Sequence, residues 1–143
     1  MSRLLAALGF VALAACAHPA AHTPQHHPDT VSAYVEAYNT RNLEAMSALM
    51  HDDVQWLAVE GDKVEVVANG KSDLTRQMRD YIGSSRATTS MLDGRLKDGR
   101  FIAVREVASW IDGDGRVQSQ SSLAVYELEA GLVRRVWYYP SSR

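Results

Sequence analysis

Two short turns near the C-terminus constrain the fold of this chain most strongly. Residues 112–115 read Asp-Gly-Asp-Gly, and residues 129–131 read Glu-Ala-Gly. Both turns separate runs that are rich in β-branched and aromatic residues, which is the pattern of β-hairpins. These runs are residues 100–111, 117–128 and 132–139. We therefore expect the chain to end in an antiparallel meander, to which residues 89–99 add a further strand.

The part of the chain before the meander has helical periodicity. Apolar residues recur at the spacing of one helix face in residues 31–38, 43–50 and 72–82. Asp29 or Thr30 is expected to cap the first of these helices. Ser72 or Asp73 is expected to cap the third.

Residues 52–70 lie between the second and third helices and alternate polar with apolar residues around a turn at residues 61–62. This pattern predicts extended structure. Helices followed by an antiparallel meander define an α+β domain with its helices packed on one face of a sheet. The composition agrees, because 46% hydrophobic and 22% charged residues are typical of a globular domain.

The N-terminus has the pattern of a signal peptide. Residues 4–15 form an apolar run that is too short to cross a membrane. The run ends on Leu-Ala-Ala before Cys16, the only cysteine in the chain. This sequence resembles the bacterial lipoprotein processing site, which implies cleavage before Cys16 and attachment of acyl chains there. The alternatives are an ordinary secretory signal with an incidental cysteine, or a buried first helix.

The resemblance to lipoproteins also implies a location. Ala17 stands where inner-membrane lipoproteins are associated with aspartate, so we expect outer-membrane attachment with the domain in the periplasm. Residues 16–28 are interpreted as a tether, because their histidines lie among prolines that disfavour an aligned helix. No metal site is expected there or at His51. The predicted organisation is a signal peptide at 1–15, a tether at 16–28 and one domain at 29–143.

Some partners and cofactors are not expected. The formal net charge is −2 and no dense block of lysine and arginine occurs, so the electrostatic signature of a nucleic-acid-binding protein is missing. The sequence also contains no glycine-rich phosphate loop and no serine nucleophile elbow. No cofactor is therefore predicted, and the expected partners are a small apolar molecule and the membrane that holds Cys16.

Three stretches resemble the nuclear transport factor 2-like superfamily and, within it, the SnoaL-like and ketosteroid-isomerase-like branch. They are residues 34–56, 70–81 and 124–140. The resemblance implies a cone-shaped fold in which three N-terminal helices and a curved antiparallel sheet enclose one apolar pocket. Dimers through the outer face of the sheet are common in the family, so a homodimer is expected by analogy. The fold alone does not specify a function.

Ketosteroid isomerase chemistry can be tested against the sequence residue by residue. The family's enzyme uses an aspartate base, a tyrosine and a protonated aspartic acid. The resemblance places the tyrosine at Tyr34, the base at Ala58 and the second acid near Ala124. A methyl group neither accepts a proton nor donates a hydrogen bond, so we do not expect this chemistry. Glu60 would restore a base only if a bulge shifted the strand.

Alternation in residues 101–111 gives two mostly apolar faces with one charged residue each. Arg105 belongs to one face, and Glu106 belongs to the other together with Trp110. We favour the Glu106 face as the inner one, because Ala108 leaves space for a ligand beside it. A buried charge must be paired or shift its pKa, so Arg105 or Glu106 would be a candidate titrating group. Alternatively, both residues form salt bridges at the rim.

The neighbouring run contributes uncharged polar groups. If the position of Ala124 faces the pocket, alternation places Gln120 and Ser122 on the same side. Such an amide and hydroxyl can orient a ligand without titrating. The expected pocket residues are Tyr34, Trp56, Arg105, Glu106, Trp110, Gln120, Ser122 and Tyr138, with the two tryptophans and Tyr138 as apolar walls.

Three hypotheses of function follow. The first is an outer-membrane-anchored periplasmic lipoprotein whose domain binds a small, largely apolar molecule. The second is an isomerase, cyclase or hydratase that uses Glu106 or Glu60 as the titrating group and Tyr34 as a donor. The third is an envelope protein-interaction module. The first is favoured, because the expected polar groups suit binding at least as well as turnover.

Overall fold

The computed structural model describes residues 29–84 and 88–139. The predicted signal peptide, the tether and Cys16 lie outside the described residues and stay predictions. Within the described part of the chain, no helix is long and apolar enough to cross a membrane.

The described residues contain the helices α1 (Thr30–Asn39), α2 (Leu43–Ala48) and α3 (Lys71–Gly83). Asp29 caps α1, as predicted, because its carboxylate accepts hydrogen bonds from the backbone N–H groups of Val31 and Ser32. The helix α2 ends earlier than predicted, since the chain is already extended at Met50.

The predicted cap of α3 was wrong. Gly70 occupies the N-cap position with a φ of 91°, a conformation that glycine adopts readily, and α3 has no side-chain cap. Asp73 lies in the first turn of the helix and accepts a hydrogen bond from the backbone N–H of Asn69 at 3.0 Å. The sharp turn into α3 is therefore made by the backbone of Gly70 and stabilised by Asp73.

In the described residues, one sheet is formed by β1 (Met50–Glu60), β2 (Lys63–Asn69), β3 (Thr89–Asp98), β4 (Phe101–Ile111), β5 (Val117–Glu129) and β6 (Leu132–Tyr138). Their order across the sheet is β2-β1-β6-β5-β4-β3. The strands β3 to β6 form the predicted antiparallel meander. The β1–β2 hairpin joins the meander because β1 pairs in parallel with β6.

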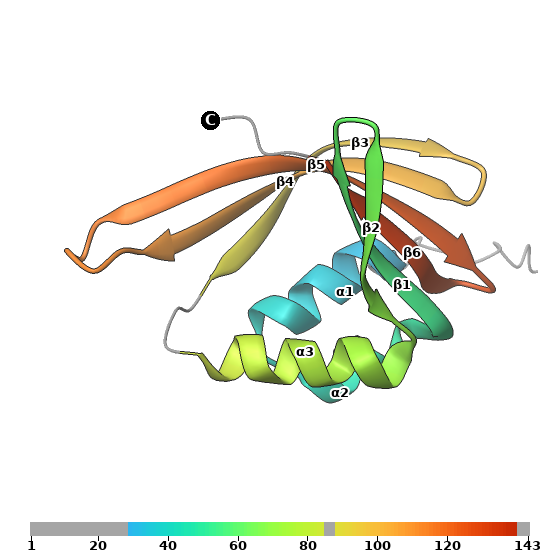
Figure 1. Cartoon of the computed structure of the whole chain (residues 1–143), viewed down its shortest axis with the longest axis horizontal. Helices are drawn as coiled ribbons and strands as arrows, with labels where there is room; N and C mark the ends of the chain where they lie inside the picture. The colour runs from blue at the N-terminus through green and yellow to red at the C-terminus, as the bar shows by residue number, and fades with distance from the viewer. Residues whose placement is uncertain (1–28, 85–87, 140–143) are drawn as a thin grey trace, which may run out of the picture.

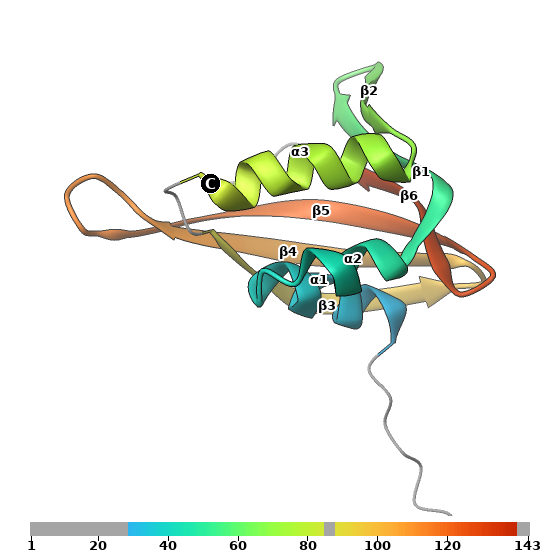
Figure 2. The same cartoon turned by 90° about the horizontal axis from the view of Figure 1, so that it is seen from below.

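The sheet curves around the helices, which lie together on its concave side (Figure 1). Seen from below, the helices lie in front of the sheet (Figure 2). The helix α1 packs on β3, and α3 packs on β1 and β2. Register shifts interrupt the β1–β2, β3–β4 and β5–β6 pairings, and such bulges bend strands. The predicted α+β class and cone-like architecture are therefore confirmed.

The hydrophobic core fills the space between the helices and the concave face. Its largest fully buried side chains are Tyr126, Met50, Leu74, Val31, Val54, Val104, Val133 and Val136. These residues come from α1, α3 and four strands, so the helices and the sheet share one core.

The outer face of the sheet carries both apolar and charged residues. Phe101 and Leu123 are 39% and 48% exposed there. Glu127 is buried, and its carboxylate contacts Arg135 at 2.7 Å and Arg100 at 3.2 Å. The homodimer expected through this face stays a prediction.

Candidate functional site

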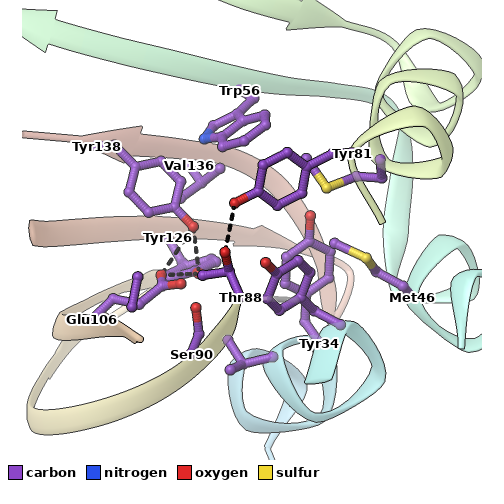
Figure 3. Close-up of a pocket in the computed structure, with 14 residues that line it drawn as sticks. Tyr34, Met46, Trp56, Tyr81, Thr88, Ser90, Glu106, Tyr126, Val136 and Tyr138 are labelled. Carbon is purple, nitrogen blue, oxygen red and sulfur yellow. Dashed lines mark hydrogen bonds between the residues drawn. The ribbon is translucent and has the colours of Figure 1, made fainter. Parts of the chain in front are cut away.

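A cavity lies between α1, α3 and the concave face of the sheet (Figure 3). Its volume is about 140 Å³. Six of the described residues that line it are aromatic: Tyr34, Tyr38, Trp56, Tyr81, Tyr126 and Tyr138. Among the described lining residues, Glu106 is the one with a charged side chain. The cavity thus combines one carboxylate with a largely aromatic wall.

Strand alternation brings Glu106 into the cavity. Ile102 and Val104 precede it on the same face of β4 and are buried in the core. Tyr138 Oη donates a hydrogen bond to Glu106 Oε2 at 3.0 Å, and Tyr126 Oη donates to the same oxygen at 3.2 Å. These contacts join side chains from three strands, β4, β5 and β6.

The three oxygen atoms of this group form a triangle, because the two phenol oxygens are also 3.2 Å apart. Each phenol has one hydrogen, so only two sides of the triangle are hydrogen bonds at any moment. Both hydrogen bonds that Glu106 accepts from described residues end on Oε2. Oε1 is therefore available to a ligand.

The phenols near Glu106 are held in their protonated form. Burial, and then the negative charge of Glu106, raise the pKa of Tyr34 and of Tyr126 well above the ordinary value. Burial, then Tyr126, and then Glu106 raise the pKa of Tyr138 in the same direction. All three phenols are consequently neutral at physiological pH.

Tyr38 and Tyr81 form one side of the cavity. Their rings stack with centroids 6.4 Å apart, and Tyr81 Oη donates to Thr88 Oγ1 at 3.2 Å. The guanidinium carbon of Arg41 lies 5.4 Å from the Tyr38 ring centroid, and Arg41 also donates to the carbonyl of Thr88 at 3.0 Å. Burial, and then Tyr81, raise the pKa of Tyr38 to about 12. These contacts tie α1 and α3 to the start of β3.

A second, more polar hollow adjoins the cavity and shares Tyr81, Thr88 and Ala108 with it. Trp110 and Gln120 line this hollow. Gln120 is exposed, so the hollow forms the solvent side of the site.

The structure places the predicted residues Tyr34, Trp56, Glu106 and Tyr138 directly on the cavity. The predicted residues Trp110 and Gln120 lie in the adjoining hollow. Ser122 pairs with Glu106 across the β4–β5 ladder and so faces the same side, but it lines neither space.

Contrary to expectation, neither Arg105 nor Glu60 lines the cavity. Alternation turns Arg105 to the outer face, where it pairs with Asp93 at 2.9 Å and its side chain is 58% exposed. Glu60 ends β1 and lines a separate hollow with Lys63 and Glu65. Neither residue brings a charge into the cavity, so neither has the pocket role that was expected of it.

Tyr38, Tyr81 and Tyr126 line the cavity although they were not predicted to do so. Tyr38 and Tyr81 lie on the apolar faces of their helices, which sequence reasoning assigned to the core. Tyr126 has the same alternation parity as Gln120 and Ala124, and that parity is the signal that could have identified it.

Residues 31–136 match the family of the SnoaL-like domain, so the match covers most of the chain. The chain belongs to this family. The SnoaL-like resemblance that the sequence indicated is therefore confirmed, together with the fold. No curated protein matches the chain significantly.

Solved structures share the fold of this SnoaL-like domain. An uncharacterized cystatin fold protein from Novosphingobium aromaticivorans is 22% identical, with a TM-score of 0.64 over 76% of this chain and 93% of that protein. An NTF2-like protein of unknown function from Burkholderia pseudomallei is 19% identical, with a TM-score of 0.63 over 76% and 86%. A protein with a ketosteroid isomerase-like fold from Catenulispora acidiphila, in complex with trimethylamine, is 13% identical, with a TM-score of 0.66 over 80% and 86%. Such low identities show the fold alone.

Metal-binding side chains do not cluster in residues 29–84 and 88–139 of the SnoaL-like domain, where no group of three or more His, Cys, Asp or Glu could hold an ion. His51 Nδ1 accepts a hydrogen bond from the backbone N–H of Asp53 at 3.1 Å. The other histidines belong to the segment predicted to be a tether, residues 16–28, and lie outside the described residues.

Proposed function

We propose that the SnoaL-like domain binds a small, largely apolar molecule in the cavity, with Glu106 as its polar anchor. The observation that carries this proposal is a hydrogen-bonded carboxylate set within an aromatic wall. Small-molecule sites are usually concave and mostly apolar, with a few convergent polar groups. The cavity around Glu106 has this form.

The cavity volume limits the size of the ligand. The value of about 140 Å³ is close to that of an apolar cavity, roughly 150 Å³, that accepts a benzene molecule. We therefore expect a ligand core the size of one six-membered ring or of a compact branched group, which is smaller than a steroid. A longer ligand would extend past Ala108 toward Trp110 and Gln120.

Ring contacts support the aromatic wall before a ligand arrives. Trp56 packs edge-on against Tyr138 with centroids 5.5 Å apart, and Tyr34 packs in the same way against Tyr126 at 6.2 Å. A preorganised site loses less conformational freedom on binding. The Catenulispora protein offers further support, because a structure of the same fold is in complex with a small molecule, trimethylamine.

Native mass spectrometry of the purified chain tests this function. We expect a small molecule to copurify, or an added single-ring probe to bind, with one molecule per chain. Ala108→Leu would fill the cavity and abolish the complex. Ala103→Leu makes the same change on the outer face of β4 and should leave it intact. If both variants, shown to be folded by circular dichroism, bind as the wild type does, the proposed site is wrong.

One observation favours proton-transfer catalysis as a second function. Oε1 of Glu106 is available in the cavity, where a carboxylate can act as a general base. Tyr34 is a neutral phenol in the same cavity and could donate to a developing oxyanion. The domain would then be an isomerase, cyclase or hydratase. Glu106→Gln should abolish such turnover while a neutral ligand still binds, and turnover that survives this change excludes the assignment.

We also propose that acylated Cys16 attaches the chain to the outer membrane, with the domain in the periplasm. The support is the sequence around Cys16, an apolar run closed by small residues before a lone cysteine. Metabolic labelling with a fatty-acid analogue should mark the wild type and the control His18→Ala, but not Cys16→Ala. Unlabelled wild-type chain in the soluble fraction would contradict the proposal.

A further inference from the structure

We propose that the ligand of the cavity carries a compact methylated ammonium group, held between the aromatic rings and Glu106. This inference rests on the proposed function, because it names the chemistry of the molecule bound in the same cavity. Three properties of the cavity support it: its charge, its aromatic surface and its largely apolar lining.

The cavity has a negative charge without a positive partner. No lysine, arginine or histidine is among the described residues that line it. The preceding residue of β4, Arg105, is not a partner either, because it pairs with Asp93 on the outer face. A carboxylate removed from water needs hydrogen bonds or a counter-charge. Two phenols supply hydrogen bonds to Glu106, and a cationic ligand would supply the counter-charge.

Aromatic rings border the space beside this carboxylate on several sides. Figure 3 shows Trp56, Tyr138, Tyr81 and Tyr34 around the space beside Glu106. The face of an aromatic ring attracts a cation within about 6 Å of its centroid, and tryptophan does so most strongly. The pairs Trp56–Tyr138 and Tyr34–Tyr126 have interplanar angles of 67° and 70°, so their faces point in different directions. Because several rings border the same space, a compact cation held there would lie against more than one of them (Figure 3).

The largely apolar lining of the cavity favours a methylated ammonium over a primary one. A primary ammonium has three N–H donors, each of which needs an acceptor. The phenols of Tyr126 and Tyr138 donate to Glu106, and Thr88 accepts from Tyr81, so the acceptors that remain beside the rings are neutral hydroxyl oxygens and the carboxylate itself. Methyl groups need no acceptor and can pack directly on the aromatic wall. Oε1 of Glu106 is the strongest acceptor that these contacts leave. A tertiary ammonium needs only that acceptor, and a quaternary ammonium needs none.

The shape of the site adds a short polar tail to this ligand. A cavity of about 140 Å³ accommodates a trimethylammonium head but not a long chain. The adjoining hollow, with Gln120 and Trp110, is more polar and lies toward solvent. A hydroxyl or similar group two or three atoms from the nitrogen would pass Ala108 and reach this hollow.

Isothermal titration calorimetry with choline and its neutral isostere 3,3-dimethylbutan-1-ol separates charge from shape, because both have a branched head and a hydroxyl tail. We expect choline to bind the purified chain at least about tenfold more tightly, since attraction to the rings and the carboxylate acts on the cation alone. Glu106→Gln should remove this preference by weakening choline much more than the alcohol. Asp93→Asn removes an exposed carboxylate from the outer face and should change neither affinity.

Equal affinities for the two probes, or choline binding that Glu106→Gln leaves unchanged, would overturn the inference while ligand binding itself still stands. If neither probe binds, the inference is also overturned. If native mass spectrometry then finds no small molecule in the cavity, the proposed function fails as well. Trp56→Leu is a second variant in case Glu106→Gln does not fold, and it should weaken choline more than the alcohol.

Discussion

The hydroxyl of Tyr138 donates a hydrogen bond to Glu106 at 3.0 Å from a position between two alanines. Ala58 on β1 and Ala124 on β5 are both in register with Tyr138. The resemblance to ketosteroid isomerases places the base of those enzymes at Ala58 and their second acid near Ala124. In this cavity the carboxylate comes from β4 instead. The carboxylate of this site therefore occupies a different position from the acids of those enzymes. Tyr138, which lies between Ala58 and Ala124, donates its hydrogen bond to it.

Tyr138→Phe tests how firmly Glu106 is held. The change removes one phenol donor but keeps the ring that packs on Trp56. Loss of this hydrogen bond should lower the free energy of unfolding, measured by urea denaturation. The loss should be only about 1–2 kcal/mol, because Tyr126 still donates to the carboxylate. Tyr139→Phe, at a partly exposed position, is the control and should have little effect. Equal losses in the two variants would contradict the role of the Tyr138 hydroxyl.

The paired arginines on the outer face should contribute unequally to stability. Arg135 and Arg100 both contact the buried carboxylate of Glu127, but their side chains are 34% and 65% exposed. Arg135 also donates to Gln55 at 3.0 Å. We expect Arg135→Met to lower the free energy of unfolding by about 2 kcal/mol, and Arg100→Met to lower it by less than about 1 kcal/mol. Chemical denaturation measures both values. Equal losses would contradict the prediction that the more buried ion pair contributes more to stability.

The sequence predicted the elements whose patterns are long and regular. The helix α1 has a capping aspartate and a periodic apolar face, and the strands β4 to β6 are separated by clear turns. The cap of α3 was missed because Gly70 makes the turn with its backbone, whereas sequence reasoning looks for a capping side chain. The early end of α2 was missed because Met50 is apolar in both interpretations, as a helix residue and as the first residue of β1.

The candidate site was less predictable, because it depends on strand register. Arg105 and Glu106 give the two faces of β4 one charge each, and only the burial of Ile102 and Val104 shows which face meets the helices. Tyr126 reaches Glu106 from a neighbouring strand, four positions along the β4–β5 ladder from the residue paired with Glu106. Such contacts follow from pairing between strands, which alternation within one strand does not specify.

Acid should weaken the attachment at the start of α1. Burial raises the pKa of Asp29, but hydrogen bonds from Arg95 and Ser32 outweigh it and lower that pKa from 3.8 to about 2. Because the pKa is lower in the folded chain, the stabilisation is present above about pH 4 and is lost as the pH falls toward 2. We expect the Tm of the wild type to fall more steeply over this range than that of Asp29→Asn, which keeps a cap but has no charge. Equal slopes in calorimetry would contradict the predicted pKa.

Alkali should reveal the buried phenols. The pKa values of Tyr34, Tyr126 and Tyr138 are raised in the folded chain, chiefly by burial. Their contribution to stability is therefore complete below about pH 10 and is lost as the pH rises above it. At about pH 11, absorbance at 295 nm should show incomplete ionisation of the six tyrosines, completed only on unfolding in guanidinium. Tyr34→Phe should reduce the delayed part, and full ionisation of the folded chain would contradict the burial of these groups.

A crystal structure of the chain with a bound ligand, either copurified or added as choline, tests the central claim most directly. We predict ligand density inside the cavity, in contact with Oε1 of Glu106 and with the ring face of Trp56. Ligand density on the outer face of the sheet, or a ligand-free cavity filled by the side chains of Tyr34 and Tyr81, would contradict the account.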